Sequence, residues 1–458
     1  MAATYQTVNP ATGEPISSYE LMSDAIADAR VEAAHRAFEQ WRTTPLAERS
    51  EIVRRIGTLI RERSDDFARL MTREMGKPIA QGGGEIGLCA AICDYSADNA
   101  ASVLGDEQRA FDGGQGLITY QPLGVILGIQ PWNFPMYQVV RYAIACITAG
   151  NAVLLKHAPN VWGMALALEA LFIEAGLPEG VFSVLLTDNA QTERLIGHDK
   201  VRGVTLTGST AAGRAVGAKA GECLKKSVLE LGSNDAYMVL ADADIDAAVA
   251  NCVQGRIYNS GQTCIAAKRF IVVDAVYDEF RAKFAEQLAA IEYGDPTDPN
   301  TQLGPLARAD LRETLHDQVM RSIAAGARCA LGGELPEGPG FFYPVTLLED
   351  IAPGMAAWEE ELFGPVAALI RVADEAEAIR VANDSRFGLG GGVFSGDTPR
   401  ATAIARDLFD TGMVNVNGYN MAQAELPFGG VKDSGYGREH GGFGMREFVN
   451  IKSVMIAG

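Results

Sequence analysis

The sequence predicts an α/β protein whose strands form doubly wound parallel sheets. From about residue 117, short β-branched runs such as GVILGI, NAVLLK and GVTLTG alternate with helical stretches such as WGMALALEALFIEAG. A second alternating series starts near residue 235 with AYMVLA and continues through RFIVVD, VAALIRV and GMVNVN. Such alternation is typical of parallel βαβ units. Because 458 residues exceed the size at which one core stops growing, two or three domains are expected.

Three further segments of the chain carry other patterns. Residues 24–72 are predicted to form long amphipathic helices, because apolar residues recur there at three- and four-residue steps. The first of these residues are Ala27, Val31, Ala34, Phe38 and Trp41. The stretch MYQVVRYAIACI, residues 136–147, is a predicted helix, and the tail EFVNIKSVMIAG is β-like. A strand that lies beyond its domain tends to pair with another subunit.

The charge balance excludes two classes of partner. The chain has 39 basic and 58 acidic residues, a formal charge of −19, and no block of Lys or Arg, so nucleic acid and anionic membranes are poor partners. The N-terminal MAATYQTVNPATGEP lacks the features of a signal peptide, and no run of about 18 apolar residues occurs, so a cytoplasmic protein is expected. Seven cysteines without CxxC spacing predict reduced thiols and no metal site.

The turn TGSTAAGR, residues 207–214, follows a strand-like run and opens a helix-like one. Backbone N–H groups at a helix start, together with the Ser209 hydroxyl, suit a pyrophosphate. The glycine spacing invites a P-loop interpretation, but Arg214 and Ala215 stand where Lys and Ser/Thr are required. The turn is therefore either a phosphate site of another kind or a helix start that Ser209 or Thr210 merely caps.

Cys264 stands on a polar, glycine-bearing turn, NSGQTC, just ahead of the strand-like run KRFIVVD. Most cysteines are small buried hydrophobes, and that is the alternative here. A partly open, polar setting is what a thiolate nucleophile needs. The five histidines lie in unremarkable surroundings, so an acid is a better candidate than a histidine for the partner of Cys264.

Two polar residues at strand ends complete a candidate site. Glu230 ends the apolar run SVLELG, at the edge where open α/β sheets bind ligands, and an apolar setting favours the raised pKa of a general base. Asn133, in QPWNFPM, is placed to present its amide N–H to a developing oxyanion. The respective alternatives are an acid turned outward and an ordinary turn residue ahead of Pro.

Together these segments resemble the aldehyde dehydrogenase superfamily along nearly the whole chain. PWNFP, LLKHAPN, TGST, LELG, NSGQTC, ELFGPV and PFGGVKDSG occur in that family's order and approximate spacing. The resemblance implies three parts and a homodimer or a dimer of dimers. The parts are a Rossmann-type dinucleotide-binding domain (1–103 and 123–233), an α/β catalytic domain (234–433) and a β oligomerisation arm (104–122 and 434–458).

The resemblance also implies a role for each candidate residue. Cys264 matches the nucleophile, Glu230 the base that activates the thiol or the hydrolytic water, and Asn133 the oxyanion donor beside the Cys264 backbone N–H. The positions that match cofactor contacts are Trp132, Lys156, Pro159, Gly208, Ser209, Leu231, Glu361 and Phe363. The positions that match substrate contacts are Tyr137, Arg141, Tyr258 and Phe428.

The implied reaction is the NAD(P)-dependent oxidation of an aldehyde through a Cys264 thiohemiacetal and then a thioester, which water activated by Glu230 hydrolyses. Family members that pass the acyl group to coenzyme A typically lack this glutamate. Its presence therefore favours hydrolysis to the acid. Outside this class, the alternatives are a cysteine hydrolase that works without nicotinamide and a non-catalytic relative.

The aldehyde is expected to be succinate semialdehyde. Arg141 lies eight residues after Asn133. An arginine at this position makes the chain resemble the succinate-semialdehyde dehydrogenase branch, in which that arginine binds the substrate carboxylate. The alternative is an arginine that extends to the surface. Tyr258 stands where some members of the branch carry a second arginine, so a broad-specificity enzyme for other small aliphatic aldehydes or semialdehydes is the second interpretation.

The motif LLKHAPN predicts that NADP is preferred and NAD possible. In NAD-preferring relatives a glutamate stands three residues after the lysine that matches Lys156, and here that position is Pro159. A ribose 2′-phosphate, which a carboxylate would repel, can pair with Lys156, and His157 would add a donor if its ring points inward. The alternative is that Pro159 only starts the following helix.

Overall fold

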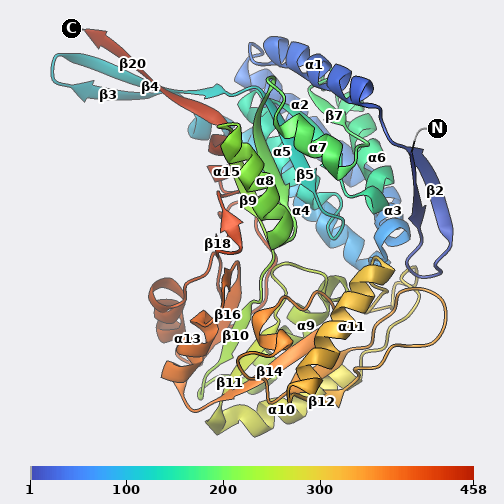
Figure 1. Ribbon diagram of the computed structural model, residues 1–458. Helices are drawn as coiled ribbons and strands as arrows, with labels where there is room; N and C mark the ends of the chain where they lie inside the picture. Colours follow the sequence, from blue (N-terminus) through green and yellow to red (C-terminus); the bar gives the residue numbers. More distant parts are fainter. Residues whose placement is uncertain (1–2, 458) are drawn as a thin grey trace.

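The computed structural model describes residues 3–457 as two α/β units with a β arm that projects from one of them (Figure 1). An N-terminal hairpin and four helices come first. Side chains from Ala27 to Trp41 on one face of the first helix are buried, which confirms the predicted amphipathic pattern. These elements are β1 (Thr4–Val8), β2 (Pro15–Glu20), α1 (Asp24–Trp41), α2 (Leu46–Glu62), α3 (Ser64–Met75) and α4 (Ile79–Leu104).

A six-stranded sheet forms the middle of the unit drawn at the top of Figure 1. Its order is β19-β9-β8-β5-β6-β7, and all neighbours are parallel except β19 and β9. The strand order reverses between β5 and β8, which is where open α/β sheets bind ligands. The strands and helices of this unit are β5 (Val125–Gln130), α5 (Tyr137–Ala149), β6 (Ala152–His157), η1 (Pro159–Val161), α6 (Trp162–Glu174), β7 (Phe182–Val184), α7 (Asn189–Ile196), β8 (Val201–Thr207), α8 (Thr210–Glu222), β9 (Lys226–Glu230) and β19 (Gly435–Tyr436).

A seven-stranded sheet in the order β12-β13-β14-β11-β10-β16-β17 forms the lower unit (Figure 1). Only the pair β12 and β13 is antiparallel, so the second alternating series also gives βαβ units, as predicted. Its strands are β10 (Ala236–Val239), β11 (Arg269–Val273), β12 (Arg328–Leu331), β13 (Thr346–Glu349), β14 (Val366–Val372), β16 (Gly391–Phe394) and β17 (Asn415–Val416). Its helices are α9 (Ile245–Ile257), η2 (Tyr258–Gly261), α10 (Asp274–Ala289), α11 (Ala309–Ala324), α12 (Ala356–Glu359), α13 (Glu375–Asn383), α14 (Thr398–Ala403) and η3 (Ile404–Leu408), and the short strands β15 (Phe387–Gly388) and β18 (Val431–Lys432) pair beside it.

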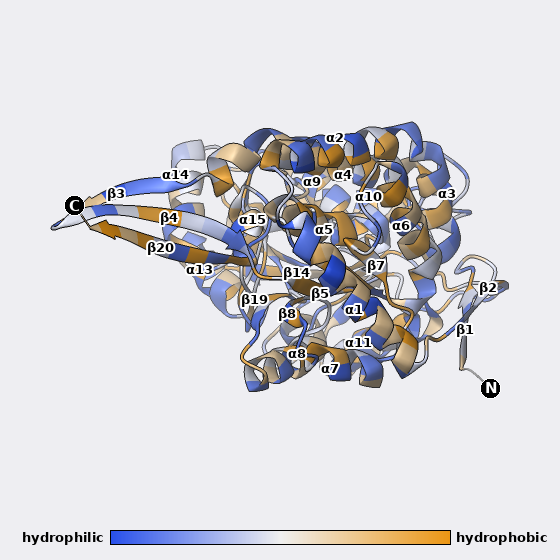
Figure 2. Cartoon of the chain, turned by 90° about the horizontal axis from the view of Figure 1, so that it is seen from above, coloured by the Kyte–Doolittle hydropathy of each residue, from blue (hydrophilic) through white to orange (hydrophobic). Residues whose placement is uncertain are grey.

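The arm is an antiparallel sheet of β3 (Glu107–Phe111), β4 (Gly114–Pro122) and β20 (Val449–Ala457), in the order β20-β4-β3. The short helix α15 (Phe443–Glu447) leads into β20. Apolar residues of β20 face solvent, among them Ile451, Met455 and Ile456. Seen from above, β4 and β20 carry apolar segments far out along the arm (Figure 2).

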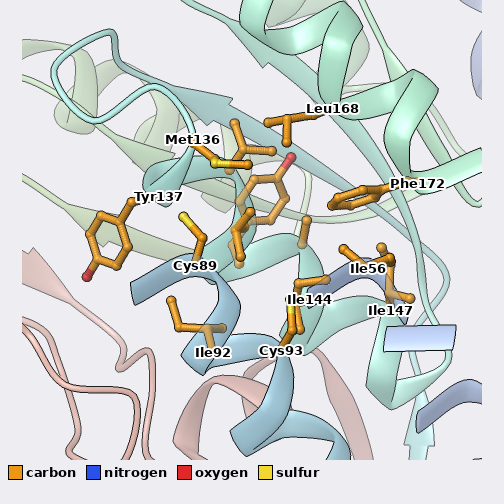
Figure 3. Close-up of a cluster of buried hydrophobic side chains, with 14 of the residues drawn as sticks. Ile56, Cys89, Ile92, Cys93, Met136, Tyr137, Ile144, Ile147, Leu168 and Phe172 are labelled. Atoms are coloured by element: carbon orange, nitrogen blue, oxygen red, sulfur yellow. The ribbon is translucent and has the colours of Figure 1, made fainter. Parts of the chain in front are cut away.

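Helix α5 runs through the middle of the upper unit with every residue buried. Ile144 and Ile147 of this helix lie in one apolar cluster with Cys89 and Cys93 of α4 (Figure 3). Burial raises the pKa of both thiols, which marks these cysteines as packing residues. The helix that carries Arg141 is continuous from Tyr137 to Ala149, and its surroundings are largely apolar.

Candidate active site

A cavity of about 370 Å³ opens at the carboxyl ends of the parallel strands, at the point where β5 and β8 diverge. Its lining residues come from the turns after β5, β8 and β9, and from the lower unit. It contains most of the residues that the sequence singled out. Its lining is Pro131, Trp132, Asn133, Gln138, Thr207, Gly208, Ser209, Leu231, Gly232, Cys264, Arg308, Leu311, Glu361 and Phe363.

Cys264 reaches the cavity from a strained turn. Asn259 and Ser260 have φ of 54° and 55°, in the left-handed region, and a Cβ on Gly261 (φ +73°) would lie 2.3 Å from the carbonyl oxygen of Gly364. Cys264 itself is partly exposed. Protein surrounds the rest of its thiol, and this burial raises its pKa to about 12. The side chain is therefore an accessible thiol that needs a base to become a thiolate.

Asn133 is tied to the same turn. Its Nδ2 donates to the backbone carbonyl oxygen of Gln262 at 3.0 Å, and the backbone carbonyl oxygen of Asn133 accepts from Asn259 Nδ2 at 2.7 Å. One amide proton of Asn133 is left for another acceptor. Within residues 3–457, no hydrogen bond uses the backbone N–H of Cys264. Two N–H donors are thus free beside the thiol, which is the arrangement that stabilises an oxyanion.

Glu230 ends β9 and is 1% exposed, so it is not the outward-facing acid of the alternative interpretation. Neither carboxylate oxygen has a hydrogen-bond partner among the described residues. Burial raises the pKa of this carboxyl well above its usual range, while the charge of Arg141 lowers it and that of Glu439 raises it. Glu230 lies one residue before the cavity wall at Leu231. An unpaired carboxyl with a raised pKa is suited to take up a proton.

Arg141 is 2% exposed, so the alternative of an arginine at the surface is wrong. Its Nη2 donates to Thr207 Oγ1 at 2.9 Å, and Thr207 lines the cavity. Its Nε forms a buried ion pair with Glu439, a partner that the sequence did not suggest. Arg141 therefore stands behind the cavity wall with its charge partly neutralised.

The three aromatic candidates surround this region rather than line the cavity. The Arg141 guanidinium lies 5.1 Å from the ring centre of Tyr137 and 4.9 Å from that of Phe428. The Tyr137 hydroxyl, which points away from the apolar cluster in Figure 3, lies 2.9 Å from His440 Nε2. Tyr258 stacks on Phe134 with ring centres 6.3 Å apart.

The cofactor candidates lie along two hollows. Glu361 accepts the backbone N–H of Ser233 at 3.0 Å, and Phe363 meets Trp132 edge-on with ring centres 5.8 Å apart. Ser209 caps α8, because its hydroxyl accepts a hydrogen bond from the Ala212 N–H. Ser209 also lines the cavity. A second hollow of about 410 Å³ lies between α7 and α8 and is largely apolar. Its lining includes Ile129, Asn189, Glu193, Leu206, Ala212, Val216 and Lys219.

Lys156 lies next to this second hollow, with Nζ 3.4 Å from Asn189 Oδ1, and burial lowers its pKa. Pro159 is the first residue of the short helix η1, as expected if this proline starts the following helix. His157 does not point inward: its Nε2 lies 2.8 Å from the Pro135 carbonyl and its Nδ1 accepts from the Ala158 N–H. Burial lowers its pKa to about 4, so the expected extra donor is absent.

The aldehyde dehydrogenase family model matches residues 1–454. The chain belongs to the aldehyde dehydrogenase family. It is 46% identical to the NADP(+) succinate-semialdehyde dehydrogenase of Deinococcus radiodurans over 98% of this chain and 94% of the relative. It is 45% identical to an NAD(P)+ succinate semialdehyde dehydrogenase of Escherichia coli K12 over 98% of this chain and 97% of the relative. The predicted family and the α/β fold are confirmed.

Solved structures agree with this assignment. The succinic semialdehyde dehydrogenase of Streptococcus pyogenes, crystallised with NADP+, superposes with a TM-score of 0.97 at 38% identity and covers 99% of this chain and 100% of its own. A protein named Gox0499, studied for cofactor and substrate selection, superposes equally well at 42% identity over 99% of this chain and 100% of its own.

Several residues of the site escaped the sequence analysis. Gln138, Thr207, Arg308 and Leu311 line the cavity, and Lys268, Glu439 and His440 support it from behind. Thr207 was recognisable as the last residue of a strand beside Gly208. The others are brought together only by tertiary packing. Within residues 3–457, no cluster of His, Cys, Asp or Glu suits a metal ion, and no helix is both long and apolar enough to cross a bilayer.

Proposed function

We propose that this protein oxidises succinate semialdehyde to succinate, with NADP preferred over NAD. The observation that supports the reaction is the convergence of Cys264, Asn133 and the end of β9 on one cavity at the switch point of the sheet. The observation that supports the substrate is the buried guanidinium of Arg141 behind Thr207. Both named relatives are succinate semialdehyde dehydrogenases.

The thiol of Cys264 carries out the first step. Because burial raises its pKa, Glu230 removes its proton, directly or through a water, and the sulfur adds to the aldehyde carbon. The carbonyl oxygen becomes an oxyanion, which accepts the Cys264 N–H and the free amide proton of Asn133. When bound, the nicotinamide of the cofactor supplies the hydride acceptor for this carbon. Cys264 then holds the product as a thioester.

Glu230 carries out the second step. Once the proton taken from Cys264 has passed to solvent, the carboxylate of Glu230 accepts a proton from water, the water oxygen adds to the thioester carbon, and Cys264 leaves as a thiolate while the acid is released. Since neither oxygen of Glu230 is hydrogen-bonded, the side chain has no bond to break when it turns toward the cavity. The same two oxyanion donors serve this step.

Arg141 holds the far carboxylate of the substrate. A guanidinium has five N–H groups. Nη1 donates one to the Tyr137 hydroxyl and Nη2 donates one to Thr207, so Nη1 and Nη2 each keep one more, while Nε faces Glu439 in an ion pair. These two N–H groups can bind one carboxylate in a bidentate manner on the Thr207 side.

The cofactor assignment follows from the two hollows. The apolar hollow between α7 and α8 fits an adenine ring, the N-terminus of α8 at Ser209 fits the pyrophosphate, and Glu361 with Phe363 fits the nicotinamide riboside. The buried ammonium of Lys156 and the uncharged Pro159 favour a ribose 2′-phosphate. These groups act by binding and orienting the cofactor.

We also propose that the protein is a homodimer or a dimer of dimers. The exposed apolar side chains of β20, at the free edge of the arm sheet, support this proposal, since an unpaired apolar edge tends to associate. The division into a dinucleotide-binding domain, a catalytic domain and an oligomerisation arm is part of the same proposal.

The test is a steady-state comparison of succinate semialdehyde with butyraldehyde, which has the same chain length and no charge, with each cofactor. We expect the highest kcat/KM for succinate semialdehyde with NADP. An equal or higher kcat/KM for butyraldehyde would replace this proposal by a broad-specificity aldehyde dehydrogenase. Absence of cofactor reduction with every aldehyde would favour the other interpretation, a cysteine hydrolase that works without nicotinamide.

A further inference from the structure

Lys268 is a fully buried lysine in the immediate surroundings of the cavity. It lies four residues after Cys264, at the entrance to β11, and is 0% exposed. Lysines are almost never buried to this degree unless they are paired. The sequence gives it no role, because it is part of an otherwise ordinary transition from a turn to a strand.

The contacts of Lys268 join two walls of the site. Its Nζ donates to the carbonyl oxygen of Cys264 at 2.5 Å and to that of Thr263 at 3.2 Å, and it lies 3.3 Å from Glu361 Oε1. An ammonium has three N–H groups, so these three acceptors satisfy it completely. One cation thus holds the backbone of the nucleophile and a carboxylate that precedes β14.

Glu361 depends on this cation for its orientation. Its Oε1 accepts both the ammonium of Lys268 and the N–H of Ser233, whereas its Oε2 has no hydrogen bond with the described residues. A Cβ on Gly232 would lie 2.2 Å from Oε2, so the carboxylate lies flat against the glycine backbone. Glu361 and Gly232 both line the cavity. The free oxygen is therefore the one available to a ligand.

We propose that Lys268 is a positioning residue of the active site: its ammonium fixes the Cys264 turn and holds Glu361 with Oε2 facing the cofactor. The proposal rests on the proposed function for the role of Glu361. It goes beyond that function because it gives two steps, thiol activation and cofactor binding, one common support. A purely structural role, anchoring the turn to β11, would leave both steps unchanged once the protein has folded.

The charge of Lys268 also acts on the thiol. Burial raises the pKa of Cys264, and among neighbouring charges Lys268 opposes this rise most strongly, followed by Arg141. The carboxylates of Glu361 and Asp235 act in the opposite sense. Two tyrosines, Tyr137 and Tyr419, also lie close enough to sense the thiol. Loss of the ammonium should therefore shift thiolate formation to higher pH.

The experiment uses Lys268→Gln, which keeps a hydrogen-bond donor and removes the charge, and Lys268→Met, which removes both. Alkylation of Cys264 by iodoacetamide is followed against pH without aldehyde, so its outcome does not depend on the substrate assignment. At a fixed neutral pH we expect alkylation to be about tenfold slower in both variants, because one pKa unit is a tenfold change in thiolate. The KM for NADP should rise severalfold in both.

The matched control is Lys77→Met. Lys77 is also fully buried and paired with a carboxylate, Glu85, but it lies over the ring of Phe134 and, within residues 3–457, makes no hydrogen bond to the Cys264 turn. The Lys77→Met substitution should lower the melting temperature and leave the pH dependence of Cys264 alkylation unchanged. Folded Lys268 variants with the parent's alkylation profile and the parent's KM for NADP would overturn the proposal.

A reciprocal variant decides the matter if neither Lys268 variant folds. Glu361→Gln removes the carboxylate that Lys268 now neutralises. The unopposed ammonium should then move the Cys264 alkylation profile to lower pH, with alkylation severalfold faster at neutral pH. An unchanged profile would show that Lys268 does not act on the thiol and would overturn the proposal.

Discussion

Two carboxylates of the candidate site, Glu361 and Glu230, differ in whether a cation is bonded to them. Glu361, on the cofactor side, bonds to Lys268 and to a backbone N–H. Glu230, at the end of β9, accepts no hydrogen bond from the described residues. Burial raises the pKa of both, but Lys268 offsets the rise at Glu361, whereas Glu230 is shifted well above its usual range.

This difference distinguishes a holding group from a reacting group. A buried carboxylate without partners is costly, and folded proteins keep such groups where function requires them. A carboxylate bonded to a cation keeps its charge and its position. We therefore expect substitution of Glu230 and substitution of Glu361 to alter different steps of the reaction.

Glu230→Gln should give the largest effect. Loss of the base should lower kcat roughly 10²- to 10⁴-fold, the range typical of general acid–base catalysis, while some acyl-enzyme still forms. Steady-state turnover measures the loss in kcat, and rapid-quench detection of the thioester measures acyl-enzyme formation. Glu361→Gln is the control, and it should change the KM for NADP more than the hydrolysis of the thioester. A Glu230→Gln enzyme with near-normal turnover would remove this residue from the mechanism.

Deletion of residues 449–458 should abolish assembly. The strand β20 pairs along the whole of β4, from Val449 opposite Pro122 to Ala457 opposite Gly114. Without it, β4 becomes an unpaired edge, so monomers or insoluble protein are expected. Size-exclusion chromatography with light scattering measures the result. A truncated protein that elutes as the parent oligomer would exclude the arm as the interface.

The substrate assignment predicts a smaller, selective loss. Arg141→Gln combined with Glu439→Gln removes the guanidinium without leaving Glu439 buried and unpaired. A charge-assisted contact is worth about 1.5 to 3 kcal/mol, so kcat/KM for succinate semialdehyde should fall roughly ten- to a hundredfold. Butyraldehyde should lose much less, and Glu439→Gln alone is the matched control. Equal losses on both aldehydes would make Arg141 a structural residue.

Cofactor preference is predicted to respond to one position. The parent should have a higher kcat/KM with NADP than with NAD, and Pro159→Glu should move the ratio toward NAD, because a carboxylate near Lys156 repels a 2′-phosphate. Pro159→Gln, which adds length without charge, is the control. A parent that favours NAD, or a Pro159→Glu enzyme with an unchanged ratio, would refute the role given to this position.

The sequence identified the reacting groups better than their supports. Cys264, Asn133 and Glu230 stand at strand ends or on glycine-bearing turns. These are local features that can be recognised in the amino-acid sequence. The partners of Arg141 and Glu361 are Glu439 and Lys268, and these pairs arise only when distant segments pack together. The direction of the His157 ring, which the sequence left open, is likewise set by residues distant in the sequence, since its ring nitrogens lie near the carbonyls of Gln130, at the end of β5, and of Pro135.

The pH dependence of stability tests the central claim, that Glu230 is a buried and unpaired base, most directly. Burial raises its folded pKa, so the folded parent is fully stabilised by this group only below the unfolded pKa of about 4.3 and loses stability as pH rises through the folded pKa. Gln does not titrate. The melting temperature of Glu230→Gln should therefore exceed that of the parent by an amount that grows with pH, on the order of 2 °C near neutrality. A difference that is independent of pH, or that favours the parent as pH rises, would contradict this account.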